Sequence, residues 1–311
     1  MKVHHSISAY ENERGSVVTI GTFDGVHIGH KKLLKKLTSE AEKTGLDSVI
    51  LTFFPHPRMV LQKESDIKLI NTIDERTSIF SKTKLDHLII HPFTHQFSRL
   101  TAQEFVRDIL VNKLHAKKII IGYDHRFGRN RNADINDLKE FGKTYHFDVE
   151  EISAQELNEV AVSSTKVRKA LEKGDLEKAN RYLGYPYMLN GTIVKGKGLG
   201  RKMNYPTANL KIEEPYKLIP KNGVYIAKSV IEDKEVFGLM SIGTNPTVGG
   251  VNRTIETYFL DIAKDLYGKK LEIELLAKIR EEEKFDSIES LQTAIQNDEI
   301  FARKYIENYA Q

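Results

Sequence analysis

Short apolar runs alternate with helical patterns through the first half of the chain, and this alternation limits the folds that the chain can adopt. The apolar runs span residues 16–20, 48–54, 87–91, 117–122 and 147–152. The helical patterns lie near residues 30–44, 74–83, 101–114 and 134–145, with Thr101 and Glu104 forming a capping box. Strands alternating with helices predict a parallel sheet covered by helices on both faces. Such sheets bind ligands at the carboxyl ends of their strands, where the strand order reverses.

The pattern changes after residue 183. Gly184, Tyr185 and Pro186 interrupt a helical run over 175–183. Closely spaced strand patterns follow at residues 189–195, 223–231, 236–242, 255–261 and 271–279. Short strands separated by glycine-rich turns predict a small antiparallel barrel. A helix over 287–308, with Ser287 as its N-cap, ends the chain. We therefore expect two domains, an α/β domain over 1–183 and a β-barrel domain over 184–311.

Composition excludes several classes of protein. The 311 residues suffice for two domains, each with its own core. No run of about eighteen apolar residues is present and the N-terminus lacks an apolar signal, so we expect a cytoplasmic protein without a membrane span. The absence of cysteine excludes disulfides, thiolate metal sites and cysteine nucleophiles. A net charge of +4 suits small anionic ligands and is too small to indicate a nucleic-acid-binding surface.

The segment 21–30, GTFDGVHIGH, lies between the first strand and the first helix. A strand that turns through glycines into a helix start presents free N–H groups and attracts phosphate. His27 and His30 are three residues apart on the first turn, so both can reach one phosphate group. Two histidines at this spacing are by themselves more often solvated or buried in a core. The complete string in its strand-to-helix context favours the phosphate site.

This string resembles the GxFDGxHxGH form of the HxGH nucleotidyltransferase signature found in bacterial FAD synthetases. That family joins an FMN adenylyltransferase module to a riboflavin kinase module. The resemblance implies a Rossmann-like nucleotidyltransferase domain over 1–183 and a riboflavin kinase-like barrel over 184–311. It implies that His27 and His30 stabilise charge on the reacting phosphates. It also implies ATP-binding roles in the same loop for Gly21, Phe23, Asp24, Gly25 and Gly29.

Three further segments of the first domain are similar to family motifs. GYDHRFGRNRNAD (122–134) resembles the flavin-side motif, which implies flavin-binding roles for Asp124, Arg126 and Phe127. His125 and Ala133 depart from the Phe and Gly that are common there, and without the family the segment is equally well an ordinary basic loop.

SSTKVRKAL (163–171) has a natural N-cap in Ser163 and, alone, is more often just a capped helix. The resemblance implies that Ser164 and Thr165 bind the ATP phosphates and that Arg168 is catalytic. FFPHP (53–57) resembles TFxPHP and is assigned to shaping the pocket. Phe54 stands where the family often has an acidic residue, and His56 is equally well structural.

The second domain carries KGKGLGRKMNYPTANL (195–210), a basic glycine segment of a kind that can fold over polyphosphate. It resembles the riboflavin kinase motif GxGxGRxxGxPTAN, with mild changes at residues 203–205. The resemblance implies metal-binding roles for Thr207 and Asn209, which hold Mg²⁺ with ATP. It implies ATP-binding roles for Gly196, Gly198, Gly200 and Arg201.

Glu256 lies in a strand pattern whose neighbours Ile255, Thr257 and Phe259 alternate to the opposite face. A carboxylate at such a position is more often a solvated surface charge. The resemblance implies that Glu256 is the general base of the kinase, and that Asn245 and Arg280 lie near the flavin.

Taken over nearly the whole chain, the resemblance implies a bifunctional enzyme. It would phosphorylate riboflavin to FMN and then adenylylate FMN to FAD, with ATP as co-substrate, Mg²⁺ as cofactor and pyrophosphate released. Its partners would be small molecules, not nucleic acid or membrane, and no pattern predicts an oligomeric state. In one alternative only one module is catalytic and the other binds flavin as a regulatory unit. In the other, the basic surface binds nucleic acid, although the aromatic residues are not interleaved with basic ones as an RNA-stacking surface requires.

Overall fold

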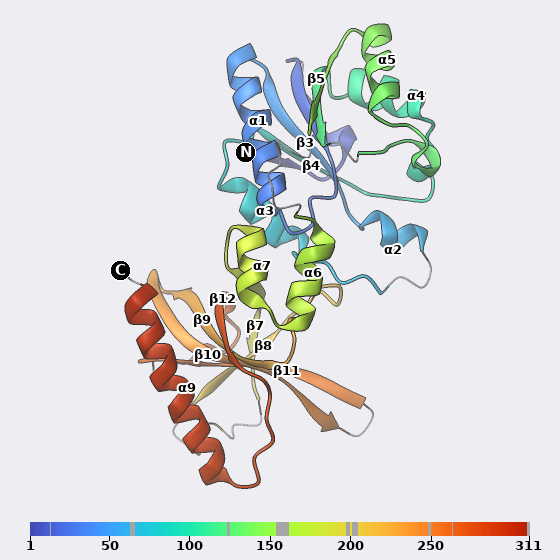
Figure 1. Cartoon of the computed structure of the whole chain (residues 1–311). Coiled ribbons are helices and arrows are strands. Elements are labelled where there is room, and N and C mark those ends of the chain that lie inside the picture. The colour runs from blue at the N-terminus through green and yellow to red at the C-terminus, as the bar shows by residue number, and fades with distance from the viewer. Residues whose placement is uncertain are drawn as a thin grey trace. The chain divides into compact units, whose positions relative to one another are not determined.

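The computed structural model describes the chain apart from residues 13, 63–65, 123–124, 154–161, 197–199, 201–204, 248–249, 263 and 310–311. Of residues 245–247 and 250–252 it describes the backbone only. The chain separates into two compact units, Met1–Ser164 and Thr165–Gln311, which are described in turn (Figure 1). Within the described residues no helix combines the length and the hydropathy needed to cross a membrane.

The first unit is built on a six-stranded sheet in which every pair of neighbours is parallel, as predicted. The strands are β1 (Lys2–His4), β2 (Ser16–Ile20), β3 (Asp47–Phe53), β4 (His87–His91), β5 (Ala116–Gly122) and β6 (Asp148–Ile152). Their order is β1-β4-β3-β2-β5-β6. The chain adds strands on one side of β2 and then, from β5, on the other side. The strand order therefore reverses between β2 and β5, and sheets of this kind bind ligands beyond the carboxyl ends of the strands at such a point.

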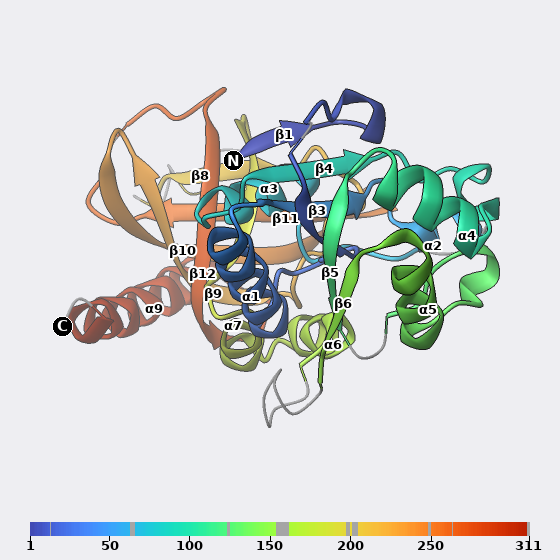
Figure 2. The same cartoon turned by 90° about the horizontal axis from the view of Figure 1, so that it is seen from above.

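Helices cover both faces of this sheet, again as predicted. They are α1 (Ile28–Thr44), α2 (Pro57–Leu61), α3 (Ile73–Ser81), α4 (Ala102–Glu104), a π-helical segment (Phe105–Val111) and α5 (Ile135–Tyr145). Short 3₁₀ turns occur at Ile7–Ala9, Phe97–Arg99 and Arg129–Arg131. Helix α1 lies on one side of the sheet, whereas α4 and α5 lie on the other (Figures 1 and 2). Successive strand residues point to opposite faces of the sheet. Val18 and Ile20 therefore pack in one core cluster with Phe105 of the π-helical segment and Leu138 of α5.

Local sequence signals account for several element boundaries. Thr101 and Glu104 form the predicted capping box at the start of α4. The helix predicted over 101–114 changes after Glu104 into the π-helical segment, where the Asn112 N–H donates to the carbonyl of Arg107. An apolar pattern cannot distinguish these two windings, because both turn the same side chains inward. Strand β1 and helix α2 are additions that the patterns did not predict.

The second unit is centred on a closed antiparallel barrel with the strand order β10-β11-β8-β7-β12-β9, which confirms the predicted barrel. Its strands are β7 (Tyr187–Val194), β8 (Thr207–Lys211), β9 (Gly223–Ile231), β10 (Lys234–Thr247), β11 (Gly250–Phe259) and β12 (Lys270–Arg280). Its helices are α6 (Ser164–Lys173), whose first residue belongs to the first unit, α7 (Leu176–Leu183) and α9 (Ile288–Tyr309). The Ser290 N–H donates to the Ser287 hydroxyl at 3.1 Å, so the predicted cap of α9 is present. Ala302 of α9 is fully buried against the barrel.

Helix α7 packs on β7 and β12 of the barrel, although the sequence placed it before the expected boundary at 183/184. Its side chains Leu176, Ala179 and Leu183 are buried. The amide of Asn180 donates to the Leu275 carbonyl at 2.9 Å and accepts from the Tyr187 N–H at 2.8 Å. Because one side chain satisfies two backbone groups, α7 and the start of the barrel are held together.

We therefore predict that a fragment of residues 165–311 is more stable than one of residues 184–311. The shorter fragment exposes the barrel surface that two buried leucines cover, and each leucine contributes about 1.5–3 kcal/mol. Within the longer fragment, Asn180→Ala should cost about 1–3 kcal/mol because it leaves buried backbone groups unsatisfied. Denaturant unfolding measures both, with the exposed Arg181→Ala as the matched control. Equal unfolding midpoints for the two fragments would contradict the role of α7.

Candidate functional site

The loop between β2 and α1 begins at the switch point and bends sharply. The Gly21 N–H donates to the Leu51 carbonyl at 3.1 Å, which extends the β2–β3 pairing by one bond. Phe23, Gly25 and Val26 then follow with φ of +49°, +88° and +33°. Gly25 is required on two grounds, since a Cβ there would also lie 2.9 Å from Ile70 Cδ1. The loop therefore has a fixed shape set by left-handed backbone.

Asp24, an expected ATP-binding residue, is 1 % exposed, and its oxygen atoms accept hydrogen bonds from other residues of the protein. Its Oδ1 accepts from the backbone N–H groups of Ile70 and Asn71 at 2.9 and 3.3 Å. Its carbonyl oxygen accepts from the hydroxyl of Ser164 at 2.8 Å. Asp24 thus joins the phosphate loop to the segment before α3 and to the last residue of the first unit. A direct contact with ATP stays a prediction for Asp24 and for Ser164.

His27 and His30 lie together at the start of α1. His27 is the N-cap, and its Nδ1 accepts from the His30 N–H at 3.4 Å. The two rings stack with their centroids 3.7 Å apart. A Cβ at Gly29 would lie 3.3 Å from the His27 ring, so glycine leaves room for this stack. Since Nδ1 of His27 accepts, the proton of its neutral ring is on Nε2.

The environment of His30 favours the neutral imidazole. Phe23 meets its ring edge-to-face at 5.1 Å. Burial, followed by the neighbouring charges of His27 and Arg76, holds the pKa of His30 well below its ordinary value. Its Nδ1 is inaccessible to solvent and makes no hydrogen bond within the described part of the chain. His30 can therefore offer an N–H donor to an anion at neutral pH without carrying a fixed charge.

Arg76 of α3 lies beneath this loop, and no sequence pattern indicated it. Its side chain is 1 % exposed, and its guanidinium donates to the Thr22 carbonyl at 2.6 Å. Thr52 of β3 donates to the same carbonyl at 3.2 Å. The helical pattern over 74–83 contains several charges, and spacing does not reveal which of them turns inward.

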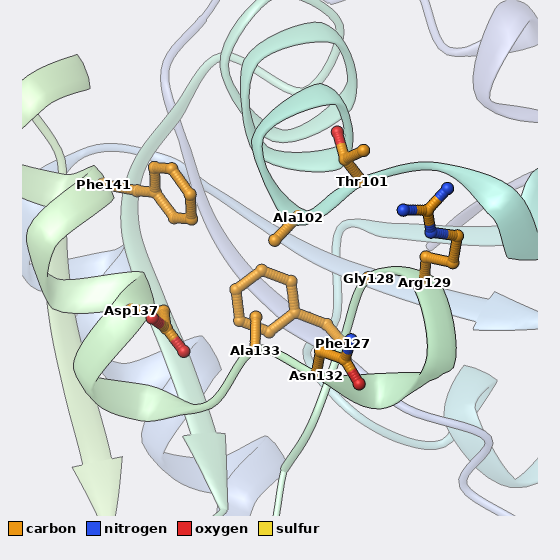
Figure 3. Close-up of a pocket in the computed structure, with 9 residues that line it drawn as sticks. All are labelled: Thr101, Ala102, Phe127, Gly128, Arg129, Asn132, Ala133, Asp137 and Phe141. Atoms are coloured by element: carbon orange, nitrogen blue, oxygen red, sulfur yellow. The ribbon is translucent and has the colours of Figure 1, made fainter.

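The segment after β5 forms a second wall of the first unit. Phe127 and Ala133 pair as an antiparallel bridge, with N–H···O bonds of 3.1 and 3.2 Å in the two directions. Gly128 has a φ of +72°, and a Cβ there would lie 2.9 Å from the backbone nitrogen of Ala102. The bridge and this close approach border an open cavity of about 280 Å³, and the Phe127 side chain is part of its wall (Figure 3). Its lining residues are Thr101, Ala102, Phe127, Gly128, Arg129, Asn132, Ala133, Asp137 and Phe141.

The other residues predicted for the first domain are distributed differently. Arg126 is exposed, and the His125 ring stacks on Phe127 at 6.2 Å, so an aromatic ring is kept at this departure from the motif. Asp124 lies outside the described residues. His56 caps α2 by accepting from the Arg58 N–H at 3.2 Å, which is the structural alternative for FFPHP. Thr165 and Arg168 belong to α6 in the second unit, and their approach to the histidines stays a prediction.

The barrel brings three of the predicted kinase residues together. Glu256 of β11 pairs directly with Asn209 of β8, so their side chains share one face. The Thr207 hydroxyl, two residues from Asn209, donates to Glu256 Oε2 at 2.9 Å. Ile255, Thr257 and Phe259 are buried on the opposite face, which confirms the predicted alternation. All three of these polar groups offer oxygen atoms, the donors that Mg²⁺ prefers.

Two described glycines of the glycine segment, Gly196 and Gly200, lie directly against this cluster. A Cβ at Gly196 would lie 2.2 Å from Asn209 Nδ2. A Cβ at Gly200 would lie 2.2 Å from the Tyr205 carbonyl oxygen and 3.4 Å from Thr207 Oγ1. Side chains at these two positions would displace the polar cluster, so glycine is required by close approach. Gly198 and Arg201 lie outside the described residues.

The two flavin-side residues predicted for the barrel are not tested by these contacts. Arg280 makes a forked ion pair with the buried Asp298 of α9, with Nε–Oδ1 and Nη2–Oδ2 distances of 3.0 and 2.9 Å. This pair fastens the last helix to β12. The side chain of Asn245 is outside the described part of the structure.

Comparisons with known proteins match both halves of the chain. Residues 9–166 match the family model of FAD synthetase, and residues 183–306 match that of riboflavin kinase. Bifunctional riboflavin kinase/FMN adenylyltransferases of Buchnera aphidicola and Escherichia coli are 38 % and 35 % identical. The matches cover 95 % and 97 % of this chain, and 95 % and 96 % of those proteins.

A solved structure described as a macrolide-efflux protein from Streptococcus pneumoniae has a TM-score of 0.89 at 30 % identity. It covers 97 % of this chain, and 98 % of its own chain is covered in return, so the two share their fold from end to end. Two family models in order, and relatives matched along nearly their whole length, decide the family. The chain belongs to the bifunctional riboflavin kinase/FMN adenylyltransferases.

Proposed function

We propose that the barrel site makes FMN from riboflavin and that the site at the switch point converts this FMN to FAD. The observation that best supports this proposal is the contact of Thr207 with Glu256 beneath the glycine segment. It joins a carboxylate that can accept a proton to the segment suited to polyphosphate. The family models match both halves, and no contact within the described residues favours the alternative in which one module only regulates. Because ATP is required twice, we place the enzyme in the cytoplasm.

In the kinase step the riboflavin 5′-hydroxyl attacks the γ-phosphorus of ATP and ADP leaves. Glu256 accepts the hydroxyl proton as the new O–P bond forms. Thr207 donates to Oε2 of Glu256 and so holds the carboxylate in one orientation, which leaves Oε1 available to the substrate. Gly196 and Gly200 allow the backbone to approach the phosphates.

Mg²⁺ fits the donor set of this site. The Thr207 hydroxyl and the Asn209 amide present oxygen atoms beside a carboxylate, and these two residues would hold the ion with ATP. The ion would supply neutralisation of phosphate charge. The protein's own contribution is to orient Glu256 and to keep side chains out of the space above Asn209.

In the adenylyl step a phosphate oxygen of FMN attacks the α-phosphorus of ATP and pyrophosphate leaves. The attacking phosphate is already anionic, so no strong base is needed. His27 and His30 donate hydrogen bonds to the oxygens on which charge develops. Thr165 and Arg168, at the start of α6, would bind the departing phosphates.

The cavity around Phe127 is the candidate site for the flavin ring. It is partly apolar and is bordered by the rings of Phe127 and Phe141, which suits a flat aromatic ligand (Figure 3). It lies after β5, on the far side of the switch point from β2.

We predict that His30→Ala lowers the kcat for FAD formation roughly 100-fold or more, since it removes one charge-stabilising donor. His27→Ala should do the same and should also weaken the start of α1. Formation of FMN from riboflavin should remain near normal in both variants. Chromatography of the flavins measures the two steps separately. Equal loss of both activities in a folded variant would contradict separate sites.

For Glu256→Gln we expect a loss of roughly 100- to 10,000-fold in FMN formation, the range of a missing general base. The amide keeps the shape and can still accept from Thr207, so riboflavin binding with ADP should persist. FAD formation from supplied FMN is the internal control, and Glu235→Gln, an exposed carboxylate on β10, is the matched one. Near-normal phosphorylation would make Glu256 an ordinary surface carboxylate.

Phe127→Ala should raise the KM for FMN in the adenylyl step about tenfold or more. The flavin ring would lose the aromatic surface on which it stacks, and such stacking of a base is worth about 1–3 kcal/mol. The KM for riboflavin in the kinase step should not change. Steady-state kinetics at fixed ATP separates the two constants. An unaltered KM for FMN would exclude this cavity as the flavin site.

A further inference from the structure

The carbonyl oxygen of Thr22 is the shared acceptor of two buried donors. Arg76 Nη1 donates to it from α3 at 2.6 Å, and Thr52 Oγ1 donates to it from β3 at 3.2 Å. Thr22 is the second residue after β2, so it lies at the switch point. Two donors from different elements fix the orientation of the peptide plane between Thr22 and Phe23.

This peptide plane determines where Phe23 points. Phe23 has a φ of +49°, a conformation that is uncommon for a bulky residue and persists only where the surroundings enforce it. Its ring is 2 % exposed and lies edge-to-face against His30 at 5.1 Å and against Phe80 of α3 at 5.9 Å. Helix α3 therefore supports His30 twice, through the backbone that Arg76 holds and through the ring of Phe80.

The charge of Arg76 acts on the same imidazole. Within the described residues, the charged groups that act on the His30 ring are His27 from α1 and Arg76 from α3. Beyond burial, His27 and Arg76 both lower the pKa of His30. Burying a guanidinium is costly even when it is hydrogen-bonded, and a packing role alone would not need its charge.

We propose that Arg76 is a positioning residue of the adenylyl step, which orients His30 through Thr22 and Phe23. Its positive charge also favours the neutral form of the His30 ring. This inference rests on the proposed role of His30. A bound polyphosphate favours the imidazolium, and the positive charge of Arg76 opposes that effect. Arg76 acts through His30 and does not itself contact the substrate.

The test compares Arg76→Gln, Arg76→Lys and Thr52→Val in the full-length enzyme. Arg76→Gln removes the charge, Arg76→Lys keeps the charge without the forked donor, and Thr52→Val removes the neutral donor to the same carbonyl. The readouts are the pH profile of kcat and the KM for FAD formation, and the NMR titration of the His30 ring. Formation of FMN from riboflavin, measured in the same samples, is the internal control.

Arg76→Gln should lower kcat roughly 10- to 100-fold, since small displacements of a catalytic group have effects of that size. The KM for FMN should stay within about threefold. The His30 titration and the acidic limb of the pH profile should move to higher pH, because removing a positive neighbour favours the protonated ring. Arg76→Lys should lower kcat with the titration unmoved, and Thr52→Val should leave the titration unmoved.

A kcat within twofold of the parent in Arg76→Gln, or an unmoved His30 titration in that variant, would overturn the inference. If Arg76→Gln does not fold, Arg76→Lys decides, and full activity in it overturns the positioning role. The proposed role of His30 fails separately, if His30→Ala retains FAD formation. Where His30→Ala is impaired, adding Arg76→Gln should cost no more than about threefold further, since the two residues act as one unit.

Discussion

The reversal of strand order between β2 and β5 is the constraint on which the first unit depends. Because β3 and β4 are added on one side of β2 and β6 lies beyond β5, the loops after β2 and β5 leave the same edge in diverging directions. All five residues of β2 are buried, so this edge is anchored in the core. The two loops carry the histidine pair and the Phe127 cavity. In the proposed function, the nucleotide and the flavin are therefore bound by loops that follow adjacent strands.

The second site reaches its geometry by a different route. Its polar residues lie within strands, and antiparallel register alone brings Asn209 opposite Glu256. A register shift of one residue would turn Glu256 into the buried face, where Thr257 now lies, so the barrel's core also enforces the position of the carboxylate. Left-handed backbone occurs in the loop of the first site, at Phe23, Gly25 and Val26. Thr207, Asn209 and Glu256 of the second site lie in regular strands. The two catalytic centres are thus sensitive to different kinds of substitution.

Whether a feature of the structure could be predicted depends on how far apart in the sequence the residues that determine it lie. Periodicity predicted the parallel sheet, the barrel and the cap residues, because those features depend on neighbours close in sequence. Strand β1 is only three residues long and is held by pairing with β4 and by the contact of His4 with His87 at 3.0 Å, 83 residues away. Arg76 was missed for the same reason, since its inward orientation is set by the carbonyl of Thr22. The motif residues Thr207 and Glu256 were found by resemblance, and their contact came only with the fold.

The His27 ring caps α1 and, in the proposed function, also donates to phosphate. The requirements for helix stability and for activity therefore conflict at this position. A serine or aspartate would cap α1 better than an imidazole nitrogen at 3.4 Å, yet neither could present a ring N–H beside His30. Position 27 is therefore one where the more stable residue is the less useful one. Adaptation of this enzyme to heat would have to strengthen other parts of the first unit and leave the opening turn of α1 weak.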